Sequence, residues 1–321
     1  MTIRTLAIAA ALALAAPVTA QAAPAEAVLD VAGPTGKLQG TMLSPAAGAP
    51  VLLIIPGSGP TDRDGNNPLG VKGSSYRLLA EALAERGVAS VRIDKRGQFA
   101  SAGAKADTAT LSVAAYADDM KAWIAEVRRR TGAKCVWLGG HSEGALVASV
   151  TAQDAEGVCG LVLISGSGRR LSDVIREQIA SNPANPPFIL EQTDKALTEL
   201  RAGRTLDVSG FHPGLQPLFG PQVQPFLISL FSYDPAELVK AYKGPVLVVQ
   251  GTTDLQITMV DAERLAAARP GVTLVRIEGM NHVLKTAPAD RLGNMSTYGD
   301  ASLPLAPGVA DAIATFVKNA R

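Results

Sequence analysis

The fold of this 321-residue chain is decided by the stretch 134–148, which reads KCVWLGGHSEGALVA. An apolar run of strand length ends at a pair of glycines, and a helical pattern of small residues follows at once. Ser142 lies between them, flanked by Gly140 and Gly144 in the pattern G-x-S-x-G. This pattern is typical of a nucleophile elbow, in which the glycines let strand and helix approach closely while a strained turn exposes the serine. The pentapeptide alone is weak evidence for such an elbow, and its place between a strand and a helix strengthens that evidence.

Strand and helix patterns alternate on both sides of this stretch. Five further apolar runs predict strands, at 51–55, 88–93, 161–165, 246–250 and 272–277. Helical patterns fall between and after them, near 75–85, 112–130, 259–268 and 309–318. Two alternating segments predict an antiparallel hairpin at 27–44. This order predicts an α/β fold with a mostly parallel central sheet, helices on both faces and polar chemistry at the carboxyl ends of the strands.

The alternation of strands and helices breaks between residues 169 and 243. Helical segments separated by proline-rich turns lie there, around 171–180, 188–202 and 222–231. We therefore expect a helical cap at 169–243, inserted into a core of residues 23–168 and 244–321. Five of the seven phenylalanines fall in this cap, at positions 188, 211, 219, 226 and 231. Most are expected to form the small core that a cap needs, and one or two could line an acyl pocket.

The first 22 residues have the three parts of a secretory signal peptide. Arg4 supplies the positive charge, and the apolar segment 6–16 is too short to span a bilayer. Small residues precede a cleavage site after Ala22, with Ala20 as the alternative. A disordered alanine-rich terminus is the other interpretation. We expect a periplasmic or secreted protein without an integral membrane segment after signal cleavage.

The balance of charge argues against two classes of partner. Cleavage would remove Arg4, one of 30 basic residues, and none of the 29 acidic residues, so the mature chain is neutral. A neutral chain without a basic stripe argues against nucleic acid or an anionic membrane surface as the partner. The length suffices for one large core or two domains and leaves the oligomeric state open.

The two cysteines, Cys135 and Cys159, each stand near the start of a predicted strand. If these strands are parallel neighbours, both sulfur atoms lie at the same edge of the sheet. An oxidising compartment would then permit a disulfide. Two buried free thiols are the alternative, because the sequence does not contain the distance between the Cα atoms.

A serine hydroxyl needs a base to take its proton and an acid to orient that base. The chain has three histidines. His141 lies inside the tight elbow, where its ring is expected to pack beside the strand, and His212 lies in the cap. His282 follows the strand at 272–277, at a carboxyl end that faces the same way as Ser142. We therefore predict that His282 is the base.

Asp254 is the predicted acid because it follows the strand at 246–250. Its rival, Asp261, lies on a predicted helix and is expected to be solvated. The order Ser142, Asp254, His282 is the chain order of the catalytic groups in an α/β-hydrolase sheet. Three residues in this order, each at the end of a strand, are far more specific than the elbow alone.

Acyl transfer places negative charge on the former carbonyl oxygen, and backbone N–H groups must receive it. The predicted donors are the N–H of Glu143, at the start of the elbow helix, and the N–H of Ser58, in the glycine-rich turn after the strand at 51–55. Ser58 has no elbow and no histidine near it in the sequence, which argues against a second nucleophile. The charges at 62–64 are expected to fix this loop, and we hypothesise that Arg63 pairs with Glu143.

This sequence lacks the motifs that are typical of metal sites and of nucleotide-binding sites. It has no His-x-x-x-His, no Cys-x-x-Cys and no dense carboxylate cluster at ligand spacing. The turn at 57–59 lacks the third glycine and the ribose-binding acid of a dinucleotide site. We expect neither a catalytic metal nor an organic cofactor.

With these residues identified, the chain resembles the α/β-hydrolase superfamily, and within it a group of bacterial serine esterases with a helical cap. The shared motifs are PGSGPTDRDG at 56–65, DKRG at 94–97, GHSEG at 140–144, GTTD at 251–254 and NH at 281–282. The resemblance implies hydrolysis of short to medium acyl esters without a cofactor. It assigns the nucleophile, acid and base to Ser142, Asp254 and His282. One departure is the segment QFAS at 98–101, where a glycine-rich turn is expected.

These observations lead us to expect a serine carboxylesterase that acts on a small-molecule ester through an acyl-enzyme on Ser142. A serine peptidase or an acyltransferase on the same fold is an alternative, because the same triad serves all three reactions. A non-catalytic ligand-binding protein is the alternative from another class. The complete triad argues against it.

Overall fold

The computed structural model describes residues 25–105 and 107–320, so the expected signal peptide at 1–22 lies outside the described residues. They form one eight-stranded sheet in the order β1-β2-β4-β3-β5-β6-β7-β8. An antiparallel hairpin of β1 and β2 lies at one edge, β2 also pairs antiparallel with β4, and all other neighbours are parallel. The strands are β1 (Ala25–Gly33), β2 (Gly36–Ser44), β3 (Val51–Ile55), β4 (Ala89–Ile93), β5 (Val136–His141), β6 (Val158–Ile164), β7 (Val246–Gly251) and β8 (Val272–Ile277). The predicted mostly parallel sheet is confirmed.

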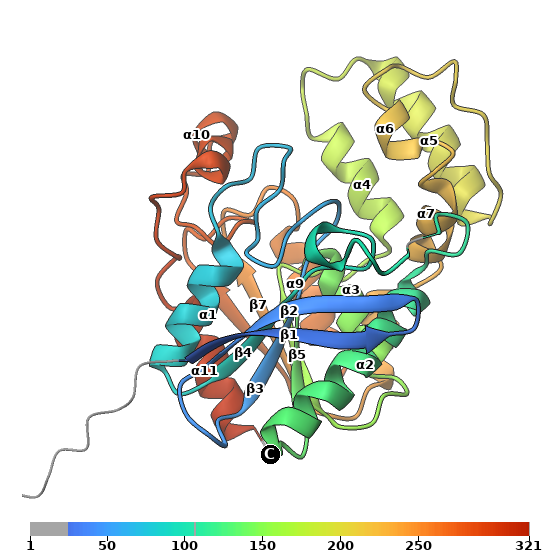
Figure 1. Cartoon of the computed structure of the whole chain (residues 1–321). Coiled ribbons are helices and arrows are strands. Elements are labelled where there is room, and N and C mark those ends of the chain that lie inside the picture. The colour runs from blue at the N-terminus through green and yellow to red at the C-terminus, as the bar shows by residue number, and fades with distance from the viewer. Residues whose placement is uncertain (1–24, 106, 321) are drawn as a thin grey trace, which may run out of the picture.

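Helices cover both faces of this sheet (Figure 1). One face carries α1 (Ser75–Glu85) and α11 (Val309–Asn319), and the other carries α2 (Val113–Thr131), α3 (Glu143–Thr151) and α9 (Met259–Ala267). The central strand β3 alternates between the two cores, since Leu52 and Ile54 pack with α1 while Leu53 and Ile55 pack with α2 and α3. A strand buried on both faces needs such a continuous apolar run. In the described part of the chain, no helix is both long and apolar enough to cross a bilayer.

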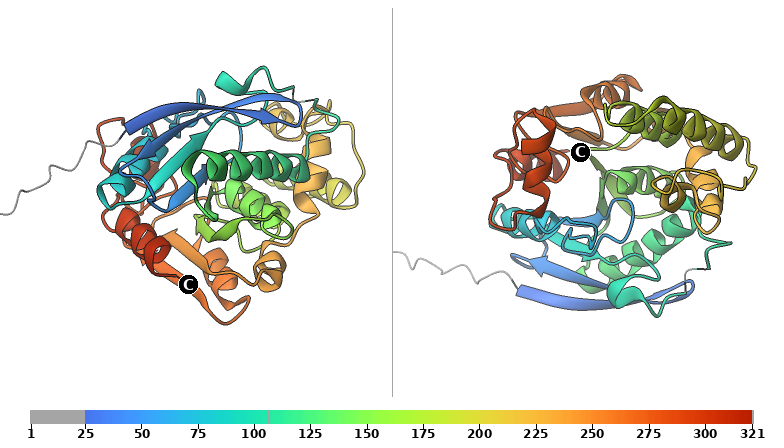
Figure 2. Two further views of the ribbon diagram at one scale, coloured as in Figure 1. Left: turned by 60° about the horizontal axis from the view of Figure 1, so that its bottom comes forward. Right: turned by 90° about the horizontal axis from the view of Figure 1, so that it is seen from above.

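The helical insertion lies between β6 and β7. It contains α4 (Leu171–Ala180), α5 (Pro187–Arg201), α6 (Gln216–Phe219), α7 (Gln224–Phe231) and α8 (Pro235–Ala241). Figures 1 and 2 show α4 to α7 as a group that stands off the sheet, whereas α8 packs against α3 and α9. Phe211, Phe219 and Phe231 are buried within this group, while Phe188 is exposed. The cap is therefore packed by apolar side chains, these rings among them, in a cluster that continues into the core on the α2 and α3 face of the sheet.

A disulfide joins β5 and β6 near their amino ends. Cys135 directly precedes β5 and Cys159 lies in β6, and their sulfur atoms are 2.05 Å apart with the Cα atoms at 5.0 Å. The two cysteines are 24 positions apart in the chain. Closing a loop of this length removes freedom from the unfolded chain, which corresponds to roughly 3 kcal/mol of stabilisation in the chain-entropy account.

The opposite, carboxyl ends of the parallel strands lie at one level. Ile55 at the end of β3 pairs with Gly140 of β5, and Gly251 at the end of β7 pairs with Ile277 of β8. Because these strands are parallel and in register, the loops that follow them begin at the same edge of the sheet. This edge is where the sequence predicts the functional groups. The short helix α10 (Arg291–Ser296), which the sequence pattern did not predict, lies beyond the same edge.

Candidate active site

The turn between β5 and α3 holds Ser142 in a strained conformation. Its φ is 55° and its ψ is −120°, a region of backbone space that residues with a Cβ rarely occupy. The flanking glycines let strand and helix meet, because a Cβ on Gly140 would collide with the carbonyl group of Gly144. A Cβ on Gly144 would likewise collide with the carbonyl group of Ile55. The turn thus explains both glycines of the G-x-S-x-G pattern.

The loops after β7 and β8 bring the predicted acid and base together. His282 Nδ1 lies 2.9 Å from Asp254 Oδ2, and both side chains are buried. Asp254 Oδ1 accepts hydrogen bonds from the backbone N–H groups of Gln256 (2.8 Å) and Ile257 (3.0 Å). Burial acts to raise the pKa of Asp254, but attraction to His282 and these hydrogen bonds outweigh it and hold the pKa below its ordinary value. Because Nδ1 donates to this carboxylate, Nε2 is left as the basic nitrogen of His282.

A chain of hydrogen bonds links the elbow to two neighbouring loops through His141. Its Nε2 lies 2.8 Å from the carbonyl oxygen of His282, and its Nδ1 lies 2.8 Å from Tyr76 Oη. Burial and repulsion from His282 lower the pKa of His141 to about 3, so its ring is neutral at pH 7. Since a carbonyl oxygen only accepts, Nε2 carries the proton, and Nδ1 accepts from Tyr76 Oη, which accepts from the N–H of Gly57 at 3.1 Å. His141 is a fixed link between loops, not a free base.

Ser142 and His282 border the same pocket, which has a volume of about 160 Å³. Gly57 approaches Ser142 so closely that a Cβ on it would lie 3.2 Å from Ser142 Cβ. Ser58, the predicted oxyanion donor, is exposed at this pocket, and no acceptor for its N–H is found within the described residues. The other predicted donor, the N–H of Glu143, belongs to the first residue of α3, directly after Ser142. The structure therefore brings the predicted nucleophile, base and donors to one place.

Glu143 and Arg63 do not form the pair that the sequence suggested. The buried carboxylate of Glu143 faces Lys95, with Lys95 Nζ 3.7 Å from Glu143 Oε1. The guanidinium of Arg63 instead binds Asp94 through Nε (2.9 Å) and Nη2 (2.6 Å). Asp94 also accepts the backbone N–H of Arg63 at 2.8 Å. The hypothesis was wrong because one carboxylate at the end of β4 satisfies both the side chain and the backbone of Arg63.

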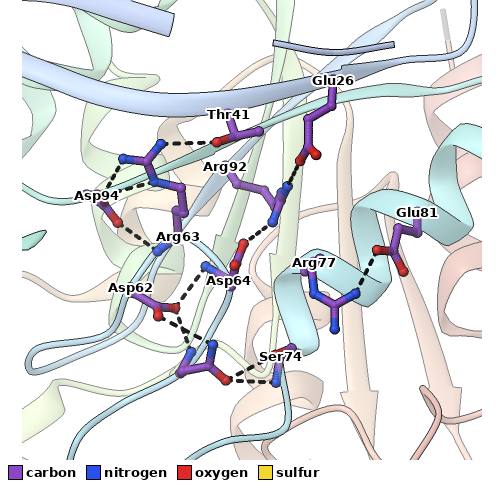
Figure 3. A network of polar contacts seen from close by, with 11 residues as sticks. Glu26, Thr41, Asp62, Arg63, Asp64, Ser74, Arg77, Glu81, Arg92 and Asp94 are labelled. Carbon is purple, nitrogen blue, oxygen red and sulfur yellow. Dashed lines mark hydrogen bonds and ion pairs between the residues drawn. The ribbon is translucent and has the colours of Figure 1, made fainter. Parts of the chain in front are cut away.

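Charged groups hold the loop between β3 and α1 against the sheet (Figure 3). Arg63 binds Asp94, which directly follows β4. Arg92, within β4, binds Asp64 of the loop and Glu26 of β1. The charges at 62–64 therefore do fix this loop, as expected, but their partners lie on and beside the strands.

The rival candidates lie away from the pocket. Asp261 on α9 is fully buried, not solvated as predicted, because the guanidinium of Arg169 binds both of its carboxylate oxygens at 3.0 and 2.7 Å. His212 is exposed in the cap, with its ring centroid 5.9 Å from that of Phe188. Neither residue borders the pocket of Ser142.

Sequence reasoning assigned no role to Tyr76, which borders this pocket, or to Lys95, which contacts Gly57 and Glu143. Tyr76 lies on the buried face of α1, where a helical pattern predicts only a core residue, so no signal distinguished it. Lys95 did have a signal, because it follows β4 at the sheet edge where polar side chains gather.

A curated relative shares part of this sequence. Esterase EstD from Thermotoga maritima is 25% identical over 250 residues, which cover 73% of this chain and 54% of EstD. The chain thus spans about half the length of the curated relative that it matches.

Solved structures share the architecture at low sequence identity. An esterase from Pyrococcus furiosus superposes with a TM-score of 0.55 and 14% identity over 92% of this chain and 93% of that chain. A proline iminopeptidase from Mycobacterium smegmatis gives a TM-score of 0.57 and 17% identity over 91% and 98%. At such identities these likenesses show the fold alone. The model of the alpha/beta hydrolase family matches residues 51–292, most of the chain and all of the predicted triad. The chain therefore belongs to the alpha/beta hydrolase family.

Proposed function

We propose that this protein is a serine carboxylesterase that hydrolyses short to medium acyl esters of a small molecule. One observation carries the proposal. Ser142, held in the elbow, and His282, oriented by Asp254, border the same pocket at the carboxyl edge of the sheet. A nucleophile, a base and an orienting carboxylate in this arrangement are the parts that acyl transfer needs.

In the proposed reaction, Ser142 Oγ attacks the ester carbonyl carbon while His282 Nε2 takes the hydroxyl proton. The tetrahedral intermediate collapses, the C–O bond to the alcohol breaks, and His282 returns the proton to the leaving alkoxide. A water molecule then attacks the acyl-enzyme, with its proton again passing through His282 to Ser142 Oγ, and the carboxylic acid leaves. Asp254 keeps the ring oriented and stabilises the imidazolium in both steps.

The negative charge of each tetrahedral intermediate falls on the former carbonyl oxygen. We assign its stabilisation to the N–H groups of Ser58, which borders the pocket, and of Glu143, which directly follows Ser142. The start of α3 adds a small favourable contribution from the helix dipole.

An uncharged ester is favoured over a peptide as the substrate. Apart from its histidines, the pocket is bordered by neutral side chains, among them Asn67, Gln256 and Tyr298. A peptidase that recognises a free amino terminus would need a carboxylate to bind that charge. The relative EstD is named an esterase. Amide hydrolysis is the second candidate, because a proline iminopeptidase has the same fold.

A chain-length series of p-nitrophenyl esters tests this proposal, with p-nitroanilides and lactones as controls. The native protein should turn over the esters, with the highest kcat/KM at short to medium acyl chains and little activity on the anilides. Ser142→Ala should lower kcat by roughly 10⁶-fold while leaving the fold intact, because the nucleophile is lost. A Ser142→Ala variant with full turnover, or higher kcat/KM on the anilides than on the esters, would contradict the proposal.

We also propose that residues 1–22 direct export and that the mature enzyme works in the periplasm or outside the cell. The Cys135–Cys159 bond supports this, because structural disulfides persist in oxidising compartments. N-terminal sequencing of the protein recovered from its native host should find Ala23 as the first residue, or Gln21 if cleavage follows Ala20. A protein that retains Met1 in the cytoplasm would contradict the proposed export.

A further inference from the structure

The buried ammonium group of Lys95 binds the peptide group between Gly57 and Ser58. Lys95 Nζ donates a hydrogen bond to the carbonyl oxygen of Gly57 at 2.7 Å. On the other side of the same residue, the N–H of Gly57 donates to Tyr76 Oη at 3.1 Å. Lys95 therefore holds the Gly57–Ser58 amide through its oxygen, and Tyr76 holds the preceding Pro56–Gly57 amide through its N–H.

The carbonyl group that Lys95 binds and the N–H of Ser58, a residue that borders the pocket, belong to one amide. Resonance in a peptide group couples its oxygen to its nitrogen. A cation at the oxygen favours the resonance form with negative oxygen and positive nitrogen, so the N–H becomes a stronger donor. Hydrogen bonds in such a chain polarise one another, and the effect is larger in a buried site than in water.

We propose that Lys95 is a positioning residue for catalysis, which orients and polarises the Gly57–Ser58 amide so that the N–H of Ser58 binds the oxyanion more tightly. The inference rests on the proposed function, and it deepens that proposal by assigning a role to a side chain that does not border the pocket.

Glu143 links the second oxyanion donor to the same cation. Its backbone N–H is the other proposed donor, and its carboxylate lies 3.7 Å from Lys95 Nζ, with both side chains 5% exposed. Burial lowers the pKa of Lys95, and the negative charge of Glu143 acts against that shift. Glu143 thus helps to retain the cation that binds the Gly57–Ser58 amide.

Removing Lys95 tests this role, provided that the test separates polarisation from simple loss of packing. Lys95→Met removes the hydrogen bond to Gly57. Lys95→Met/Glu143→Gln removes both charges, so it leaves no unpaired buried carboxylate and keeps the test open if the single variant does not fold. The neighbouring pair Arg96 and Asp119, 7% and 2% exposed, provides the matched control Arg96→Met/Asp119→Asn. That pair makes no contact with Gly57.

Two ligands make the readout specific. An alkyl trifluoromethyl ketone forms a tetrahedral adduct with a serine nucleophile and places an oxyanion between the donors. The corresponding trifluoromethyl carbinol has nearly the same shape but cannot form the adduct. A loss of oxyanion stabilisation weakens only the binding of the ketone, whereas a distorted pocket weakens the binding of both the ketone and the carbinol.

Without Lys95, we expect kcat to fall and the inhibition constant of the ketone to rise by about tenfold or more, less than the roughly 10²–10³-fold loss from deleting a donor outright. KM and the affinity for the carbinol should stay unchanged, and the control pair should change none of these values. Unchanged ketone affinity, or equal weakening of ketone and carbinol, would overturn the role of Lys95. Absence of ester turnover in the native protein would instead overturn the proposed function itself.

Discussion

The two regions that extend beyond the carboxyl edge of the sheet, the loop at 56–74 and the helical cap, are held in place by different forces. The loop is fixed by ion pairs with the strands, among them Arg63–Asp94, whose side chains are 15% and 2% exposed. The cap is held together by apolar packing around Phe219 and Phe231. Most of its ion pairs lie on the surface, as in Arg176–Asp194, where the side chains are 52% and 44% exposed. The buried exception, Arg169–Asp261, joins the first residue of the cap to α9.

This difference corresponds to what each region contributes to the pocket. The loop borders Ser142 directly, and none of the described residues that border the pocket comes from 169–243. Charge-assisted hydrogen bonds have a defined direction and length, so they can hold the backbone of the loop at a fixed place beside Ser142. Apolar packing is non-directional, which suffices for a region that does not border the pocket. The comparison predicts that substitutions at the sheet edge and its loop affect activity strongly and that substitutions in the cap affect it little.

Among the substitutions that compare the sheet edge with the cap and leave Ser142 in place, the largest effect is expected from Asp254→Asn. The amide oxygen would stay with the N–H groups of Gln256 and Ile257, so the amide NH₂ would face Nδ1 of His282 as a donor. The ring proton would then move to Nε2, and the ring could not act as the base. We expect kcat to fall by roughly 10⁴-fold. Steady-state kinetics with a p-nitrophenyl ester measure this loss.

Asp261→Asn is the matched control for this variant, because Asp261 is an equally buried carboxylate that binds Arg169 and does not contact His282. Its kcat should equal that of the native enzyme. Equal losses in the two variants would mean that a buried carboxylate, and not the orientation of His282, matters for activity.

The next largest effect concerns the attachment of the loop. Arg63→Met leaves Asp94 buried and unpaired, so the free energy of unfolding should fall by about 3 kcal/mol or more, and kcat/KM should fall with it. Urea denaturation and ester kinetics provide the two measurements. Arg176→Met in the cap removes an exposed pair and should change neither value. The comparison between loop and cap would fail if the cap variant lost as much stability as the loop variant.

A smaller, pH-dependent effect should come from His141. Because the pKa of His141 is about 3 in the folded protein, the unfolded chain binds a proton below pH 6.5 that the folded chain does not bind. Stability is therefore fully present above pH 6.5 and is lost as the pH falls. Between pH 7 and pH 5, the native protein should lose about 2 kcal/mol more unfolding free energy than His141→Gln. His212→Gln, at an exposed position, should behave like the native protein, and an identical pH dependence in all three proteins would disprove this link.

The smallest effect is expected in the cap. Phe188→Ala should leave both kcat/KM and the preferred acyl length unchanged, because Phe188 is exposed and does not border the pocket. Val71→Phe offers the opposite case, since Val71 of the loop borders the pocket and a larger side chain should exclude the longer esters. A shift of the chain-length profile in the cap variant would show that the cap does contribute to acyl binding.

The sheet and its helices could be predicted because each element carries its own periodic pattern. Runs such as 51–55 must be apolar throughout to be buried on both faces, and the elbow glycines are required by a close approach that no other residue permits. The meeting of Asp254 with His282 could be predicted for a related reason, since each follows a parallel strand that ends at the same edge. Their roles in catalysis stay a prediction.

What could not be predicted depends on pairs of side chains that are distant in the chain. Asp261 was expected to be solvated because its own helix suggests a surface position, and it is buried only because Arg169 reaches it. Acidic residues follow two strands, Asp94 after β4 and Glu143 after β5. The sequence does not show which of them lies nearer to Arg63. The helical pattern of α1 gives no indication that Tyr76 forms a hydrogen bond with His141.

The central claim is that Ser142 is the activated nucleophile of this fold, and covalent labelling tests it most directly. The native protein should react with one equivalent of a fluorophosphonate, lose its ester hydrolysis in proportion, and carry the adduct on Ser142 in peptide mass spectrometry. His282→Ala should suppress the labelling, because the base that activates the hydroxyl is gone. Ester hydrolysis that persists without an adduct, or an adduct on Ser58 in place of Ser142, would contradict the account.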